Sequence, residues 1–234
     1  IALVATAFFV LVPSLLPRTI AGIPEKESVA FFFLFAAFYF FLEAFTSEKL
    51  KKGVICGILA GIATGLLGLT WGGITFAFLA IAGATLFAFI LNKIDGKKFL
   101  FYSLWLVSSI FLMIPFSTRY TLESLITSSS TGLSFVVLFI LIVDFLIFKK
   151  KIFGLNEKTK KVKLPEQVIA IIIATLLGIL ASSAVFGIAF IGDIFKDVIS
   201  HAVEPFTPSR FGVTVAENKQ PYFTSDWKGE FGPV

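Results

Sequence analysis

The chain has 234 residues, of which 57% are hydrophobic and 15% are charged, and its formal net charge is +5. A chain with 30 Phe and so few charges would aggregate in water, which excludes a soluble globular protein and indicates a polytopic membrane protein. The single Cys, Cys56, excludes a disulfide within the chain and any Cys-based metal site, and we expect it to be a small packing residue.

Seven apolar runs approach the roughly 20 residues that a helix needs to cross a bilayer. They cover residues 1–17, 28–46, 54–70, 72–91, 99–116, 132–148 and 166–192. The predicted fold class is therefore an all-α membrane protein. It is a polytopic transmembrane helix bundle of about seven spans over 1–192, followed by a long exterior loop over 193–234.

The first run opens on Ile1 without a basic region and without a small-residue cleavage site, so it is predicted to be a span and not a signal peptide. The only Met is Met113, and no structural unit is predicted to be complete where the chain stops at Val234. We therefore expect an internal fragment of a longer protein, with N-terminal spans and a C-terminal soluble domain outside it.

The basic residues predict the orientation of the spans. The breaks 46–53, 92–98 and 149–165 carry 13 of the 20 Lys and Arg, so this side is predicted to be cytoplasmic. The breaks 17–27 and 117–131 and the segment 193–234 would then face the exterior. The net positive charge mainly reflects this topology. Membrane lipids are the partners that we expect for these basic residues. No interleaving of aromatic and basic residues indicates a nucleic-acid partner.

The first exterior break, 17–28, carries two carboxylates, Glu25 and Glu27, just before a span begins. Two carboxylates in an extended or turned backbone can converge on a hard divalent cation, which takes oxygen ligands. The alternative is that they form an acidic helix start, which the helix dipole favours.

The second exterior feature is the turn at Trp71, Gly72 and Gly73, between the runs 54–70 and 72–91. Trp is expected at a membrane interface, and paired Gly permits a tight re-entry. The preceding helix carries Gly at every fourth position, namely Gly53, Gly57, Gly61 and Gly65. This groove predicts close contact with another helix, and a lipid tail is the weaker alternative.

The third exterior feature is the polar end of the chain. From 191 to 203 apolar residues recur at intervals of three and four, as in a helix that lies on the membrane surface. The segment 209–234 then suits a long loop able to fold over a bound substrate. The only His, His201, is predicted to be solvated and not a ligand.

Three motifs together resemble the catalytic subunit of oligosaccharyltransferase, and more particularly its archaeal form. Arg18–Ala30 is similar to the family's second exterior acidic motif, and Trp71–Gly73 to the Trp and double Gly of a central transmembrane hairpin. Thr214–Glu217, followed by Gln220 and Pro221, is similar to the Thr-Ile-x-Glu or Ser-Val-x-Glu motif of the fifth exterior loop. The resemblance covers essentially the whole chain.

The chain departs from the family at two places. Glu25 and Glu27 stand where the family usually has Asp, and Pro17 stands where a small polar residue usually precedes the arginine. The first acidic motif is expected upstream of the chain and the Trp-Trp-Asp-Tyr-Gly signature beyond it, so we expect the chain alone to be inactive.

The resemblance implies a lipid-dependent glycosyltransferase fold and an inverting, metal-dependent reaction. An oligosaccharide would pass from a dolichol phosphate or diphosphate carrier to the asparagine of an Asn-x-Ser or Asn-x-Thr acceptor polypeptide, on the extracellular face of the cell membrane. The implied catalytic residues are Glu217 and Arg18, and Mn²⁺ or Mg²⁺ would be held by Glu25, Glu27 and Glu217. The implied substrate-binding residues are Thr214, Arg210 and Trp71, although Arg210 also suits contact with lipid headgroups.

Two other functions stay open at this point. Another lipid-dependent glycosyltransferase, such as a mannosyltransferase, would share the exterior carboxylates. A lipid flippase or transporter would place charge near the bilayer midplane or repeat broken helices in two halves. The sequence shows no internal repeat, and its carboxylates Glu43 and Asp144 fall near the predicted cytoplasmic ends of spans.

Overall fold

The computed structural model describes residues 26–150 and 164–187 and six residues of the segment that follows, namely 192, 193, 196, 199, 200 and 203. The elements of this part are all helical. They are α2 (Lys26–Thr46), α3 (Leu50–Thr70), α4 (Ile74–Ile90), α5 (Gly96–Phe116), α6 (Leu122–Thr127), α7 (Ser129–Asp144), a π-helical turn η2 (Phe145–Lys149) and α9 (Glu166–Phe186).

Five of these helical segments are long and apolar enough to cross a membrane. They are Lys26–Thr46, Leu50–Thr70, Gly96–Phe116, Thr131–Lys149 and Glu166–Ala184, and the apolar α4 is shorter, with 17 residues. The all-helical membrane fold is confirmed for the described residues. The first predicted span, 1–17, lies outside them and stays a prediction. So does the exterior loop 193–234, of which the few described positions are helical and exposed.

Two differences from the predicted elements lie at the end of the bundle that carries α6. The last span was predicted to reach residue 192, but α9 ends at Phe186. Gly187 then adopts φ +85° and ψ 161°, a conformation that glycine permits and that cannot continue a helix. The short helix α6 was not predicted. It starts at a capping box, in which Thr121 and Ser124 each accept a hydrogen bond from the other's backbone N–H.

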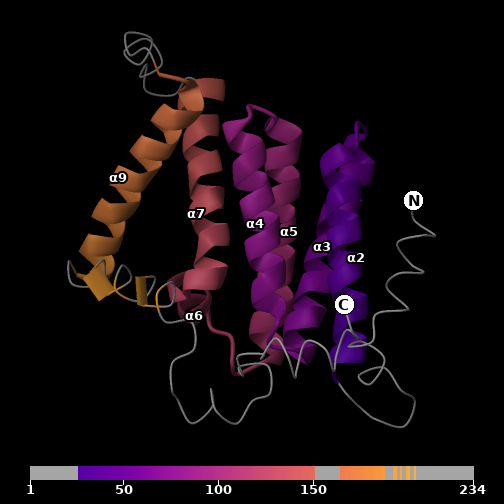
Figure 1. Ribbon diagram of the computed structural model, residues 1–234. Coiled ribbons are helices and arrows are strands. Elements are labelled where there is room, and N and C mark those ends of the chain that lie inside the picture. Colours follow the sequence, from indigo (N-terminus) through magenta and orange to yellow (C-terminus); the bar gives the residue numbers. More distant parts are fainter. Residues whose placement is uncertain are drawn as a thin grey trace, which may run out of the picture. The chain divides into compact units, whose positions relative to one another are not determined.

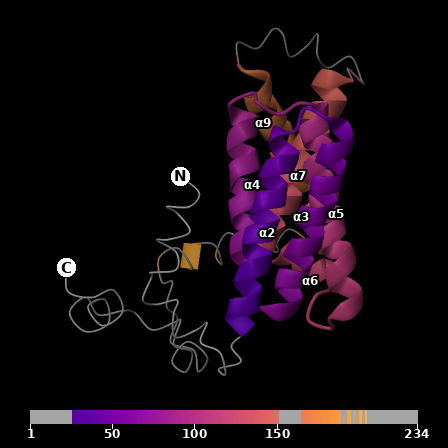
Figure 2. The ribbon, with the colours of Figure 1, turned by 90° about the vertical axis from the view of Figure 1, so that its right-hand side faces the viewer.

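Residues 30–193 form one compact unit. Within it, successive helices run in alternating directions (Figures 1 and 2). The closest pairs are α3 with α5, α4 with α7, and α7 with α9. The breaks at 47–49 and 91–95 fall at the end drawn at the top of Figure 1, and the turn at 71–73 falls with α6 at the opposite end. This alternation agrees with the two groups of breaks predicted from the basic residues.

The glycine face of α3 packs directly on α5. A Cβ on Gly57 would lie 3.1 Å from the carbonyl oxygen of Phe101, and one on Gly65 would lie 3.2 Å from that of Ser109. Both are tighter than ordinary van der Waals contact, so the two backbones approach as closely as glycine permits. Of the two uses predicted for this groove, helix packing is confirmed. Cys56 is buried beside Phe101, as expected of a packing residue.

The centre of the unit is aromatic, and its polar groups are paired. The Trp105 ring packs on those of Phe41 and Phe78, with centroid distances of 5.7 and 5.4 Å. Its indole N–H donates to Thr64 Oγ1 at 3.0 Å, and the Tyr102 hydroxyl donates to the carbonyl of Ser134 at 2.9 Å. These bonds satisfy donors that neither lipid nor apolar side chains could satisfy.

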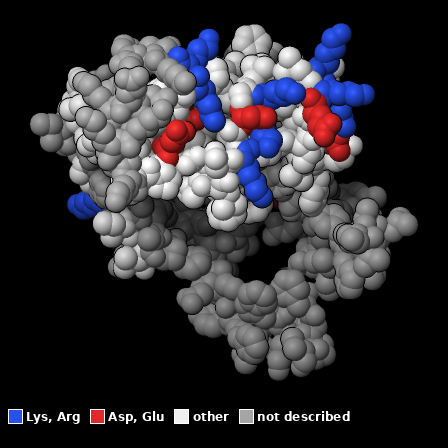
Figure 3. All heavy atoms as spheres, turned by 90° about the horizontal axis from the view of Figure 1, so that it is seen from above, with Lys and Arg blue, Asp and Glu red and all other residues white. Residues whose placement is uncertain are grey.

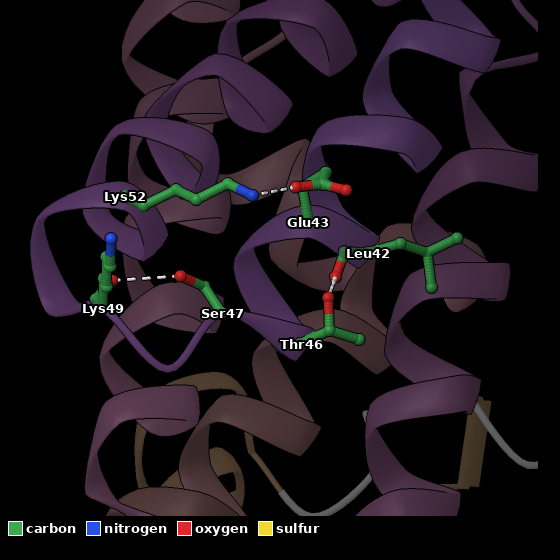
Figure 4. A network of polar contacts seen from close by, with 6 residues as sticks. All are labelled: Leu42, Glu43, Thr46, Ser47, Lys49 and Lys52. Carbon is green, nitrogen blue, oxygen red and sulfur yellow. Dashed lines mark hydrogen bonds and ion pairs between the residues drawn. The ribbon is translucent and has the colours of Figure 1, made fainter.

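The end drawn at the top of Figure 1 gathers the lysines of the described breaks, and Figure 3 shows basic side chains around it with carboxylates among them. Figure 4 shows how the α2–α3 connection closes there. Lys52 forms an ion pair with Glu43, Ser47 Oγ donates to the Lys49 carbonyl at 3.0 Å, and Thr46 Oγ1 bonds back to its own helix. A carboxylate near a span end is thereby neutralised by a neighbouring lysine.

The contact between α3 and α5 predicts different effects for two glycine substitutions. In Gly61→Ala the new methyl group would overlap Ser108 and the backbone carbonyl of Trp105, and a carbonyl cannot move away cheaply. We expect a loss of about 1–3 kcal/mol, the usual cost of overpacking, measured as a lower melting temperature of the protein in detergent.

The matched control is Gly83→Ala in α4, where a Cβ would meet nothing within 4 Å. This variant should melt at or slightly above the temperature of the unchanged protein, because Ala is the better helix former. Equal melting temperatures for the two variants would show that the glycine face of α3 does not hold the helices together.

Candidate functional site

Two of the seven predicted site residues, Trp71 and Glu27, lie within the described part of the chain. The other five lie outside it, and their roles stay predictions: Arg18, Glu25, Thr214, Arg210 and Glu217.

Glu27 lies in the first turn of α2 and is 7% exposed. A carboxylate at this position interacts favourably with the N-terminal end of the helix dipole, as the helix-start interpretation predicts. Its oxygens are also of the kind that Mn²⁺ and Mg²⁺ prefer, so the residue type fits a metal. Among the described residues, no group of three or more His, Cys, Asp or Glu is placed to hold an ion. Glu25 and Glu217 are not among those residues.

The Trp71 turn joins α3 to α4 through three residues. The Trp71 N–H donates to the Leu67 carbonyl at 2.8 Å and ends α3, and the Phe76 N–H donates to the Gly73 carbonyl at 3.0 Å as α4 begins. The indole packs edge-on against Phe31 of α2, with a centroid distance of 5.7 Å. It also covers Gly73 so closely that a Cβ there would overlap the ring. Gly73 is therefore required by the position of Trp71.

A second loop, residues 117–121, packs against this turn. The Tyr120 hydroxyl donates to the carbonyl of Gly68, in the last turn of α3, at 3.0 Å. The Arg119 guanidinium lies over the Tyr120 ring, 5.7 Å from its centroid. A Cβ on Gly72 would lie 3.6 Å from Nη2 of Arg119. The turn and the loop are thus in contact at the end of the bundle where α6 lies (Figure 1).

The two loops, together with residues of α6 and α7, border a half-open cavity of about 200 Å³. Ile74, Leu125 and the backbone of Gly72 form the less polar part of its wall. The polar side chains that line it are Thr75, Arg119, Tyr120, Ser124, Ser128 and Thr131. A positive charge and several hydroxyl groups around so small a space suit a small, polar, negatively charged group.

Tyr120 contributes a neutral hydroxyl to this cavity. Burial raises the pKa of Tyr120 above its usual range, and the Arg119 charge offsets part of that rise. A phenol with a raised pKa keeps its proton throughout the physiological pH range. It can therefore donate to Gly68 and adds no negative charge beside the cavity.

The sequence predicted the turn at Trp71 but not the cavity beside it. Arg119 falls in the break 117–131, for which the sequence predicted only an exterior position. The sequence gives only a weak indication of the cavity, namely an arginine and a tyrosine shortly after an apolar span. Their contact with the Trp71 turn depends on the pairing of α3 with α5, which the sequence does not state.

One family model matches this chain over residues 1–216, and its description is "Oligosaccharyl transferase STT3, N-terminal". The matched residues include Arg18, Glu25, Glu27 and the Trp71 turn, and they end one residue before Glu217. A search of curated proteins and a search of solved structures each found no match.

The contact between Trp71 and Gly73 predicts the effect of a single methyl group. Gly73→Ala should push the indole off Gly73 and weaken its contact with Phe31, because a Cβ would overlap the ring. We expect stronger acrylamide quenching of tryptophan fluorescence and a loss of roughly 0.5–1.5 kcal/mol of stability, the range for an aromatic pair.

Gly72→Ala is the control for this prediction, because the nearest atom to its Cβ would be 3.6 Å away, an ordinary contact. It should leave both the quenching and the melting temperature unchanged. The same change in both variants would mean that the turn responds to any added bulk and that the position of the indole over Gly73 is not the cause.

Proposed function

The chain belongs to the oligosaccharyltransferase STT3 family, and on this premise we propose that it transfers an oligosaccharide from a dolichol phosphate or diphosphate carrier to the asparagine amide of Asn-x-Ser or Asn-x-Thr acceptor polypeptides. The observation that carries the proposal is the family match over 216 residues, which covers the described bundle of membrane-length helices. The source in an archaeon rests only on the resemblance of the motifs to the archaeal form.

The reaction needs an activated amide. The lone pair of an amide nitrogen is delocalised into the carbonyl group, so the nitrogen is a poor nucleophile. Carboxylates that accept hydrogen bonds from both amide N–H groups would hold the asparagine with its lone pair available for attack on the sugar. Glu217 is the acceptor-side carboxylate in this proposal. Thr214, three residues before it, would contact the acceptor from the same loop.

The leaving group is an anionic phosphate, and its charge must be neutralised as it departs. Glu25, Glu27 and Glu217 form a set of hard oxygen donors, which fits Mn²⁺ or Mg²⁺. A divalent ion held there would stabilise the negative charge on the departing phosphate. Arg18, seven residues before Glu25, would balance the charge of the carboxylates or meet a phosphate through its planar guanidinium. Arg210 would meet a lipid phosphate or the headgroups.

We place the reaction on the extracellular face of the cell membrane, in a multi-pass protein. The lysines of the described breaks between spans gather at the end of the bundle opposite the Trp71 turn, as the excess of basic residues on cytoplasmic sides predicts (Figure 3). Trp71 would then lie at the outer interface, where a lipid-linked substrate presents its sugar.

A transporter or flippase is disfavoured by the charges within the described spans. The carboxylate of Glu43 is paired with Lys52 near the basic end, and Asp144 precedes the turn that ends at Lys149. Among the described residues, no acidic or basic side chain lies in the middle of a span, where a transport pathway would need one.

The proposal predicts metal-dependent glycosylation of a peptide. With the full-length protein in membranes, a lipid-linked oligosaccharide donor and a fluorescent Asn-x-Thr peptide, we expect transfer in Mn²⁺ and none in EDTA. Glu217→Gln should lower transfer by at least a hundredfold, the usual order for a group that stabilises the reacting geometry. Glu25→Gln and Glu27→Gln should raise the Mn²⁺ concentration needed for half-maximal transfer.

Glu48→Gln is the matched control, because Glu48 is an exposed carboxylate at the basic end of the bundle. It should transfer at the normal rate with the normal need for metal. An unchanged rate in Glu217→Gln would remove this residue from the reaction. Transfer of the sugar to water, to a lipid or to a second sugar, with the peptide left unmodified, would favour the mannosyltransferase type.

A further inference from the structure

The cavity beside the Trp71 turn has no role in the reaction as proposed so far. Its walls come from three parts of the unit 30–193: the start of α4, the loop 117–121, and the region where α6 gives way to α7. All of them are described residues, so the cavity can be analysed on its own geometry.

Arg119 supplies the positive charge of this cavity. Its side chain is exposed, lies over the Tyr120 ring and forms no ion pair with a carboxylate of the described residues. Stacking holds the planar guanidinium in a defined orientation and leaves its N–H groups available for an oxyanion.

The start of α4 adds donors of the same kind. Gly73 is the N-cap of α4 and has no side chain with which to cap the first turn, and Ile74 and Thr75 of that turn line the cavity. The first N–H groups of a helix have no partner within it, and the helix dipole favours a negative charge beside them. The Thr75 hydroxyl forms no hydrogen bond with another described residue, so it too can donate to a bound group.

The far wall of the cavity adds neutral groups. Ser124 and Thr131 each donate their only hydroxyl proton to a backbone carbonyl, that of Thr121 and that of Leu125, so they are fixed in place and do not donate to a bound group. Since the Tyr120 phenol stays protonated, no ionised carboxylate or phenolate lines the cavity, and a bound anion would meet only donors and neutral groups.

An apolar groove lies on the helix that leads into Arg119. It has a volume of about 310 Å³ and is formed by Val107, Ile110, Phe111, Ile114 and Pro115 of α5, in the half of the helix that ends at residue 116. Phe111 is 78% exposed. A ligand that carries both an anionic group and a long hydrocarbon chain can place its charged group at the cavity while its chain stays in the bilayer beside α5.

We propose that Arg119, Thr75 and the first turn of α4 form a phosphate subsite for the lipid-linked donor, with the isoprenoid chain along the outer face of α5. The inference rests on the proposed function, because it takes the donor to be a polyprenyl phosphate or diphosphate. None of the carboxylates proposed to hold the metal is among the residues that line the cavity, so the subsite binds phosphate without an ion. Arg119 is a substrate-binding residue in this proposal, and Thr75 supports it with one neutral hydrogen bond.

The test measures binding and not transfer. Full-length protein in phosphatidylcholine nanodiscs is titrated with farnesyl diphosphate in EDTA, with farnesol as the ligand that lacks phosphate. We expect Arg119→Gln to weaken farnesyl diphosphate binding about tenfold or more, as the loss of charge-assisted hydrogen bonds predicts, and Arg119→Lys to keep part of the affinity. Thr75→Val, which keeps the shape of the side chain, should weaken binding a few-fold. Lys51→Gln, at the basic end, should bind normally.

Two results would overturn the proposal. One is equal affinity for farnesyl diphosphate in Arg119→Gln and in the unchanged protein. The other is displacement of farnesyl diphosphate by dioctanoyl phosphatidylglycerol at equal concentration, because the cavity would then hold an ordinary phospholipid headgroup. A protein that binds farnesyl diphosphate through Arg119 but glycosylates no peptide would contradict only the proposed transfer reaction. Normal transfer and normal binding in Arg119→Gln would contradict only the subsite.

Discussion

The close approach of α3 and α5 is the contact on which the rest of the described bundle depends. Between helices in lipid there is little hydrophobic driving force, so association relies on van der Waals packing, which small residues permit at short range. With Gly57 and Gly65 at the interface, backbone carbonyls of α5 lie where a side chain of α3 would otherwise be. Trp105 of α5 can then donate a hydrogen bond from its indole N–H to Thr64 of α3. This specific bond fixes the register of the two helices, which packing alone would not fix.

The same pairing determines what the bundle presents at the end that carries the Trp71 turn. When the last turns of α3 and α5 are held together, the residues that follow each helix must meet. Tyr120 then donates to Gly68 across a separation of 52 residues, and Arg119 comes to lie beside Gly72. The cavity between these loops is therefore a consequence of helix packing in the membrane, and its shape depends on glycines at positions where no chemistry occurs.

The sequence predicted the six described apolar helices and the packing use of the glycine face because both depend on local pattern. It placed several helix starts too late: α3 begins at Leu50 and α5 at Gly96, before the apolar run, because charged residues at a span end are still helical. Asp95 shows this directly, since its side chain accepts from the N–H of Lys98 and caps α5. The cavity could not be predicted, because it requires knowing which helices pair. The carboxylate motifs were found by their resemblance to a family, and most of them lie outside the described residues.

Charge explains why a separate phosphate subsite would be useful to an enzyme of this kind. The proposed metal site of Glu25, Glu27 and Glu217 would be strongly negative before any metal binds, and the proposed donor substrate is an anion. Within a Debye length of about 8 Å these charges would oppose the approach of the phosphate. A cation that is not paired with those carboxylates could hold the phosphate first, and in the proposal this cation is Arg119, which stands on a loop fixed to α3 by Tyr120. Since Tyr120 stays neutral, its proton keeps that loop in place without adding to the negative charge that the donor must approach.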